Sequence, residues 1–206
     1  MSLCRALRAS IAFAVALLIA SSAQAQQGEA AKVVEAFHDA LLNVMRNADG
    51  LGFEGRFRAL TPTVKGSFNL RLMTRYTVTS RHWRKMDKKQ RRRLIDAFTG
   101  YTVAIYADRF DGFSGQRFEV LGERAVPRGA VIVQSRIVKA DGDDVRIDYL
   151  MQATNKKWRI VDVFLKGAIS ELATRRSEYV SVIKKRGYDG LIAAIVERTQ
   201  KLGQGA

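Results

Sequence analysis

Residues 130–165 read AVIVQSRIVKADGDDVRIDYLMQATNKKWRIVDVFL, three runs rich in Val, Ile, Phe and Tyr that are separated by turn sequences. The turns are Asp141-Gly142-Asp143 and Asn155-Lys156-Lys157, and a fourth run precedes the three across Pro127-Arg128-Gly129. Short β-branched runs broken by such turns are typical of consecutive hairpins. The sequence therefore predicts a four-stranded antiparallel sheet with strands Arg117–Leu121, Ala130–Lys139, Val145–Ala153 and Trp158–Leu165.

One face of this sheet is expected to be apolar. In the third run every second residue is apolar, namely Val145, Ile147, Tyr149 and Met151. The residues between them are more polar and include Arg146, Asp148 and Gln152. Because successive side chains of a strand point to opposite faces, the apolar set shares one face. We expect helices to pack on it.

Helical spacing of apolar residues appears before the strands. A helix over 29–45 is predicted from the recurrence of Val33, Phe37, Leu41 and Val44. Thr61-Pro62 is typical of a helix start, and Phe68, Leu72 and Tyr76 follow at intervals of four. The β-branched pair Val78 and Thr79 weakens that helix locally.

Two further regions complete the helical prediction. Asp87 is a predicted N-cap for a helix reaching about Ala107. Beyond the strands, helices are expected over 169–186 and 191–202, with Gly187 at the end of the first. The order of helices, sheet and helices predicts a single α+β domain.

The N-terminus has the three parts of a secretory signal peptide. Arg5 and Arg8 precede the apolar run Ile11–Ala20, and Ala23-Gln24-Ala25 supplies an Ala-x-Ala end. A retained membrane anchor is the alternative, but the run is short of the roughly 20 residues needed to span a bilayer. We therefore expect residues 1–25 to be removed and residues 26–206 to form the exported domain.

Charge and cysteine content restrict the function of that domain. Cys4 is the only cysteine and lies in the signal segment, so the remainder has no disulfide or thiolate metal site. Two of the 35 Lys and Arg residues also lie there, which leaves 33 against 20 acidic residues, a net charge of +13. Such a charge favours an anionic partner. Export argues against nucleic acid and leaves a phospholipid surface or an acidic protein.

Motifs for catalysis, cofactors or metals are missing from the sequence. His38 and His82 lie in separate predicted helices without zinc-ligand spacing. There is no Gly-x-Ser-x-Gly and no glycine-rich phosphate loop. Asp162 alternates with Trp158, Ile160 and Phe164, so it is a candidate acid/base residue in an apolar pocket. The favoured alternative is that Asp162 caps the backbone or bridges to an arginine, because buried carboxylates are usually paired.

The segment Trp158-Arg159-Ile160-Val161-Asp162-Val163-Phe164-Leu165-Lys166-Gly167-Ala168-Ile169-Ser170 resembles the Trp, Asp, Gly and Ser pattern of the MlaC family. These are periplasmic phospholipid-binding proteins, also called toluene-tolerance proteins. The resemblance continues through 174–179 and 185–191 and covers 76–106. Residues 109–123 resemble HpnM, the hopanoid-associated branch of the family.

The resemblance implies helices wrapped around a twisted four-stranded antiparallel sheet, with lipid tails in an apolar cavity between them and the head group near the mouth. It implies a periplasmic, non-enzymatic carrier that moves lipid between the two envelope membranes. The inner-membrane partner would be an ABC-type complex in the phospholipid branch and an RND-type exporter in the hopanoid branch. An outer-membrane lipoprotein would be the other partner.

Candidate site residues follow from the periodicity. The expected cavity wall consists of Phe68, Leu72, Tyr76, Phe98, Tyr106, Tyr149, Met151 and Phe164. The candidates for head-group or membrane contact are Arg84, Lys88 and Arg91. Two other hypotheses stay open: a basic docking adaptor that uses residues 81–93 and holds no internal ligand, and an enzyme with Asp162 as its base.

Overall fold

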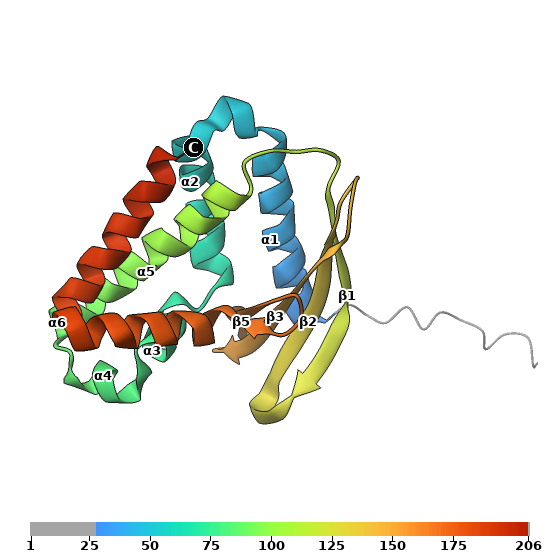
Figure 1. The fold of residues 1–206 in the computed structure, drawn as a ribbon. Coiled ribbons are helices and arrows are strands. Elements are labelled where there is room, and N and C mark those ends of the chain that lie inside the picture. The colour runs from blue at the N-terminus through green and yellow to red at the C-terminus, as the bar shows by residue number, and fades with distance from the viewer. Residues whose placement is uncertain (1–27, 206) are drawn as a thin grey trace, which may run out of the picture.

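A single antiparallel sheet, with its strands in chain order, lies against one side of a group of helices (Figure 1). A computed structural model describes residues 28–205; the predicted signal peptide, its cleavage site and Cys4 lie outside the described residues. The strands are β1 (Arg117–Val126), β2 (Ala130–Val138), β3 (Val145–Thr154), β4 (Lys157–Leu165) and β5 (Ile169–Ser170). The predicted α+β architecture is confirmed.

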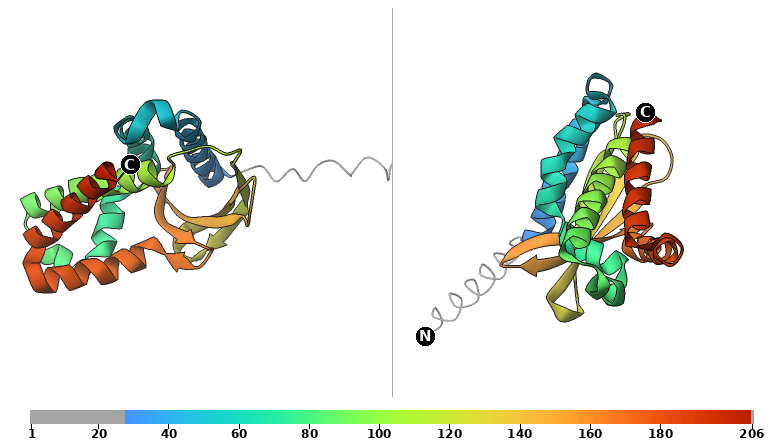
Figure 2. Two further views of the ribbon diagram at one scale, coloured as in Figure 1. Left: turned by 45° about the horizontal axis from the view of Figure 1, so that its top comes forward. Right: turned by 90° about the vertical axis from the view of Figure 1, so that its left-hand side faces the viewer.

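The sheet has five strands, so the prediction of four is wrong by one. Ile169 and Ser170 pair with Leu165 and Phe164 before the last helix begins. A strand of two residues is too short to show an alternating pattern. The curved sheet lies against the helices (Figure 2), and Val133, Ile147, Tyr149 and Met151 of β2 and β3 belong to the buried core.

The first five helices precede the sheet. They are α1 (Glu29–Arg46), α2 (Ala48–Ser67), α3 (Leu70–Thr77), α4 (Thr79–Lys85) and α5 (Lys88–Arg109). The helix predicted to be weakened at Val78 and Thr79 is interrupted there, since α3 ends at Thr77 and Thr79 has a φ of +63°. Asp87 caps α5 as predicted: its carboxylate accepts a 2.7 Å hydrogen bond from the Gln90 N–H, and the Gln90 Oε1 accepts one from the Asp87 N–H.

Thr61-Pro62 does not begin a helix, because both residues lie inside α2. The Thr61 hydroxyl donates to the Phe57 carbonyl one turn earlier, at 2.8 Å. The backbone of α2 departs from helical geometry at Gly52 instead, where φ is +57° and ψ is −178°. Only glycine adopts that conformation without strain.

The two helices predicted after the sheet are the halves of α6 (Glu171–Gln204). At Gly187 φ is +68° and ψ is −171°, and the helix turns sharply there (Figure 1). The second half runs beside α5 (Figure 1), and Gly203 in its last turn lies close to Phe53 of α2. Within residues 28–205, no helix combines the length and the apolar character needed to cross a membrane.

Candidate functional site

An apolar pocket of about 360 Å³ lies between α5, the inner face of the sheet and the first turns of α6. Its apolar wall consists of Phe68, Met73, Phe98, Ile105, Tyr106, Phe110, Ile137, Val145, Ile147, Tyr149, Val163, Leu165 and Leu172. Its polar lining residues are Tyr101, Thr102, Arg109, Lys166, Glu171 and Arg175. The pocket is therefore a hydrocarbon-lined space with charged groups along part of its border.

A second groove, of about 770 Å³, lies between α2, α5 and the β3–β4 hairpin. It is larger, but its lining is much more polar and includes Lys65, Arg71, Asp96, Lys157 and Arg159. Phe68 lines both spaces. Because apolar walls are what a hydrocarbon ligand requires, the smaller pocket is the better candidate site.

Regular spacing in α5 and the sheet builds most of the pocket. Phe98, Tyr101, Thr102, Ile105 and Tyr106 lie three or four residues apart and therefore share one face of α5. Opposite them, the alternation of β3 brings every second residue to the inner face of the sheet.

Four of the eight predicted wall residues line this pocket: Phe68, Phe98, Tyr106 and Tyr149. Met151 is fully buried on the inner face of β3 but belongs to the packed core beyond the pocket. The remaining three, Leu72, Tyr76 and Phe164, do not line it. Each of the three is displaced by a local irregularity of the backbone.

Phe164 is displaced by a bulge in β4. Ile160 pairs with Met151 and Asp162 pairs with Leu150, which leaves Val161 as an extra residue in β4. An extra residue reverses the alternation beyond it. Val163 and Leu165 therefore reach the pocket, and Phe164 lies on the opposite face of the sheet.

Leu72 and Tyr76 are displaced because the helical repeat does not include Phe68. Phe68 has an extended backbone, and α3 begins only at Leu70 after the N-cap Asn69. Met73 then points into the pocket in place of Leu72, and Tyr76 is 42% exposed. The four-residue repeat was counted from Phe68, which lies before the helix begins, so it assigned Leu72 and Tyr76 to a face of α3 that does not line the pocket.

A buried polar pair lies behind the apolar wall. His38 Nε2 is 3.0 Å from the Tyr149 hydroxyl, and the His38 ring stacks on Phe118 with 4.3 Å between centroids. Burial lowers the pKa of His38 to about 3, so its imidazole is neutral at physiological pH. Burial also raises the pKa of Tyr106 and of Tyr149, which keeps both phenols neutral. The inner part of the pocket therefore carries no charge.

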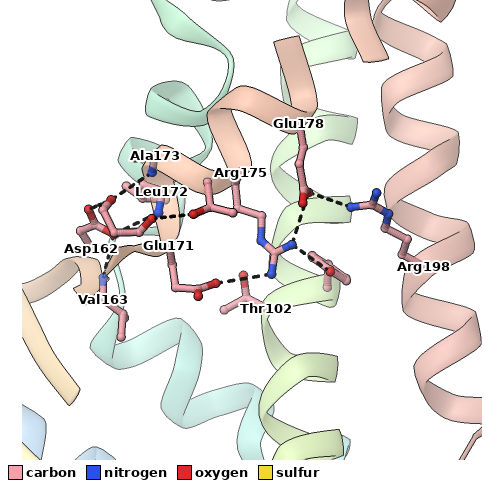
Figure 3. A network of polar contacts seen from close by, with 12 residues as sticks. Thr102, Asp162, Val163, Glu171, Leu172, Ala173, Arg175, Glu178 and Arg198 are labelled. Atoms are coloured by element: carbon pink, nitrogen blue, oxygen red, sulfur yellow. Dashed lines mark hydrogen bonds and ion pairs between the residues drawn. The ribbon is translucent and has the colours of Figure 1, made fainter. Parts of the chain in front are cut away.

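Asp162 does not line the pocket, and its carboxylate is hydrogen-bonded to the chain around it (Figure 3). Its Oδ1 accepts hydrogen bonds from the Val163 and Leu172 N–H groups, at 2.8 and 3.1 Å. Its Oδ2 accepts one from the Ser170 hydroxyl at 2.6 Å, and Ser170 is itself the N-cap of α6. Asp162 thus ties β4 to the start of α6, which is the capping alternative, without a bridge to an arginine.

Glu171 and Arg175 of α6 line the pocket and belong to a network of charged side chains (Figure 3). Arg175 is 3.5 Å from both Glu171 and Glu178, and Glu178 is also 2.9 Å from Arg198. Sequence reasoning did not select Arg175 as a site residue. The sequence did contain a signal for it. Arg175 lies three residues after Leu172 and four before Tyr179, so it shares the buried face of the helix with them.

The three predicted head-group or membrane contacts lie at the α4–α5 junction and do not line the pocket. Arg84 and Lys88 are exposed. Arg91 is half-buried: its guanidinium donates to the Trp83 and Arg84 carbonyls and stacks on the Trp83 ring. We use the name basic cluster for the exposed cations of this junction, Arg81, Arg84, Lys85, Lys88, Lys89 and Arg92, none of which forms an ion pair within residues 28–205.

Metal ligands do not gather anywhere in the described part of the chain: no group of three or more His, Cys, Asp or Glu side chains is placed to hold an ion. His38 is hydrogen-bonded to Tyr149, and His82 lies 3.4 Å from the Tyr188 hydroxyl.

Comparison with known proteins extends these observations. The family model described as MlaC protein matches residues 35–197. A solved phospholipid-binding protein from Ralstonia solanacearum, in complex with a phospholipid, superimposes with a TM-score of 0.74 over 85% of this chain and 99% of that one. The two sequences are 21% identical, so this likeness shows a shared fold.

Proposed function

The chain belongs to the MlaC family, and we propose that it is a non-enzymatic lipid carrier of the periplasm. Residues 26–206 would act as one lipid-binding domain after removal of the signal peptide. The lipid would lie in the apolar pocket and be shuttled between the inner and the outer membrane.

The apolar pocket is the observation that carries this proposal. Burying hydrocarbon stabilises a complex by about 0.8 kcal/mol per CH₂ group, so a few methylenes suffice to hold a lipid out of water. The pocket volume of about 360 Å³ lies near the lower end of the range of small-ligand sites, about 300 to 1,000 Å³. A ligand with two long acyl chains would therefore require the walls to move apart.

Two ligand classes are supported by different observations. The phospholipid bound to the solved Ralstonia solanacearum protein supports a phospholipid. The resemblance of residues 109–123 to the HpnM branch supports a hopanoid, a rigid polycyclic hydrocarbon. The transporter partner follows the ligand: an ABC-type complex for a phospholipid and an RND-type exporter for a hopanoid, with an outer-membrane lipoprotein as the other partner.

The hydrogen bonds of Asp162 favour a carrier over an enzyme. Both carboxylate oxygens accept hydrogen bonds from the chain, two from backbone N–H groups and one from Ser170. A general base needs an oxygen within reach of a substrate proton. Asp162 does not line the pocket in which a substrate would lie.

Mass spectrometry of lipids extracted from protein purified out of its native envelope tests the proposal. A carrier brings lipid with it, and the lipid class decides between phospholipid and hopanoid. Protein that is lipid-free when purified, and that takes up no lipid from vesicles, would contradict the carrier function.

A second function is favoured by the basic cluster. Its six exposed cations, which form no ion pair with any residue of 28–205, would attract an anionic membrane surface. In this alternative the protein is a docking adaptor with no internal ligand. Delipidated protein that binds anionic vesicles in a salt-sensitive way, yet extracts no lipid from them, would support the adaptor.

A further inference from the structure

The guanidinium of Arg175 is mostly buried, yet it has no short ion pair with a carboxylate of the described residues. Its side chain is 14% exposed, and it lies against the Tyr101 ring with 4.9 Å between its Cζ and the ring centroid. The Tyr101 hydroxyl accepts a hydrogen bond from it at 3.2 Å. A cation in such a position usually has close anionic partners, because an unpaired buried charge is costly.

The carboxylates near Arg175 are more distant than strong partners would be. Glu171 and Glu178 are each 3.5 Å away, whereas charge-assisted hydrogen bonds are about 2.7–2.9 Å long. Glu178 makes its shorter contact, 2.9 Å, with Arg198 (Figure 3). Glu171 has no shorter ion pair among the described residues, so it is the less firmly held of the two.

Arg175 is placed where it can contact a molecule bound in the pocket. Arg175 and Glu171 both line the pocket, beside apolar Leu172 and Leu165. Exposed Arg109 and Lys166 line it too, so cations outnumber carboxylates in its lining by three to one. An anion attached to a hydrocarbon chain would meet Arg175 where the apolar wall ends.

We propose that Arg175 binds the anionic head group of the lipid and that Glu171 is the carboxylate which the head group displaces. A planar guanidinium suits two oxygens of a phosphate or another oxyanion. This inference rests on the proposed carrier function and assigns the discrimination between charged and uncharged lipids to one side chain.

The test compares two ligands that share their tails: dioleoyl phosphatidylglycerol, which is anionic, and dioleoylglycerol, which is uncharged. Each is titrated into delipidated full-length mature protein carrying a displaceable fluorescent fatty acid. We expect the wild type to bind the anionic lipid about ten- to a hundredfold more tightly, the usual effect of hydrogen bonds to a charged group. Glycerol phosphate, which has no tails, should displace nothing at millimolar concentration.

The variants identify the residue responsible. Arg175→Met should lower the affinity for the anionic lipid to that for dioleoylglycerol, and Arg175→Lys should keep part of the preference. Glu171→Gln should raise the anionic affinity severalfold and leave the uncharged one unchanged. Arg93→Gln, which removes the surface ion pair with Asp189, is the matched control and should behave as wild type.

The outcomes separate this inference from the carrier proposal. Equal binding of the two lipids by wild type, or a preference that survives in Arg175→Met, overturns the assignment of Arg175 and leaves the carrier standing. Binding of glycerol phosphate as tightly as of lipid would make this a free-phosphate site and overturn it as well. Failure of the wild type to bind either lipid contradicts a phospholipid carrier, the form of the carrier proposal on which this inference rests. If Arg175→Met does not fold, the other two variants decide whether Arg175 binds the head group: Glu171→Gln should bind the anionic lipid more tightly, and Arg175→Lys should keep part of the preference for it.

Discussion

His38 lies behind the pocket wall, where its Nε2 is 3.0 Å from the Tyr149 hydroxyl. Its pKa is lowered by burial from 6.5 to about 3. Between these two values the unfolded chain binds a proton that the folded protein does not, so the free energy of unfolding falls as the pH falls. The contribution of neutral His38 is fully present above pH 6.5 and is lost progressively toward pH 3.

Urea unfolding at pH 7.5 and pH 5.0 measures this dependence. From His38 we expect a loss of about 2 kcal/mol between the two pH values, at about 1.4 kcal/mol per pH unit below the unfolded pKa. His38→Gln should lose this part of the pH dependence, and His82→Gln, which changes the only other histidine, should retain it. An equal drop in wild type and His38→Gln would contradict the assignment.

Asp162 connects two elements through a single carboxylate. Asp162→Asn replaces one accepting oxygen by an amide NH₂ that cannot accept. The hydrogen bond donated by Ser170, or the two donated by Val163 and Leu172, are therefore lost. We expect the free energy of unfolding to fall by about 1–3 kcal/mol, measured by urea denaturation. Asp144→Asn, at a half-exposed ion pair with Arg136, should change it by less than about 0.5 kcal/mol. Unchanged stability of Asp162→Asn would return Asp162 to the list of functional candidates.

At the scale of elements, the sharp turn of α6 depends on Gly187. Its φ of +68° with ψ of −171° belongs to a region that residues with a Cβ rarely adopt. Gly187→Ala should therefore cost about 1–3 kcal/mol of stability although no atom lies within 4 Å of the added methyl group. Gly66→Ala, in the helical part of α2 and equally free of neighbours, should be neutral or stabilise by up to about 1 kcal/mol. Thermal unfolding of the two variants makes the comparison, and equal effects would show that backbone strain is not the cause.

Features that depend on local chemistry were predictable from the sequence, whereas those set by pairing or by a helix boundary were not. The alternation of β3 and the cap at Asp87 depend only on local chemistry, and both are where the sequence placed them. The bulge at Val161 comes from pairing with β3, which no local pattern records, and it moved Phe164 off the pocket face. The extended residue Phe68 ended the helical repeat in the same way and moved Leu72 and Tyr76. Four of the eight predicted wall residues therefore line the pocket. Arg175 lines it as well and was not predicted, because a charge was not expected on an apolar face.

At the scale of the whole molecule, part of the net positive charge is concentrated on one surface, the basic cluster. Neutralising three members of the basic cluster, Arg84→Gln, Lys88→Gln and Lys89→Gln together, should weaken binding to phosphatidylglycerol vesicles about a hundredfold at low salt. The estimate rests on about 1 kcal/mol for each cation near an anionic membrane. A control triple in and after the β1–β2 hairpin, Arg124→Gln, Arg128→Gln and Lys139→Gln, removes the same charge from exposed positions. Vesicle co-sedimentation with equal losses for both triples would mean that net charge, and not this surface, governs docking.

The central claim is that a lipid lies in the pocket between α5 and the sheet, and filling that space tests it. Ile105→Trp places a larger side chain in the pocket, and Ile132→Trp places the same side chain on the opposite face of the sheet. Native mass spectrometry of protein purified from the envelope then gives the share of chains that carry lipid. We predict that wild type and Ile132→Trp carry lipid while folded Ile105→Trp is largely empty. Equal lipid occupancy of all three proteins would contradict the account.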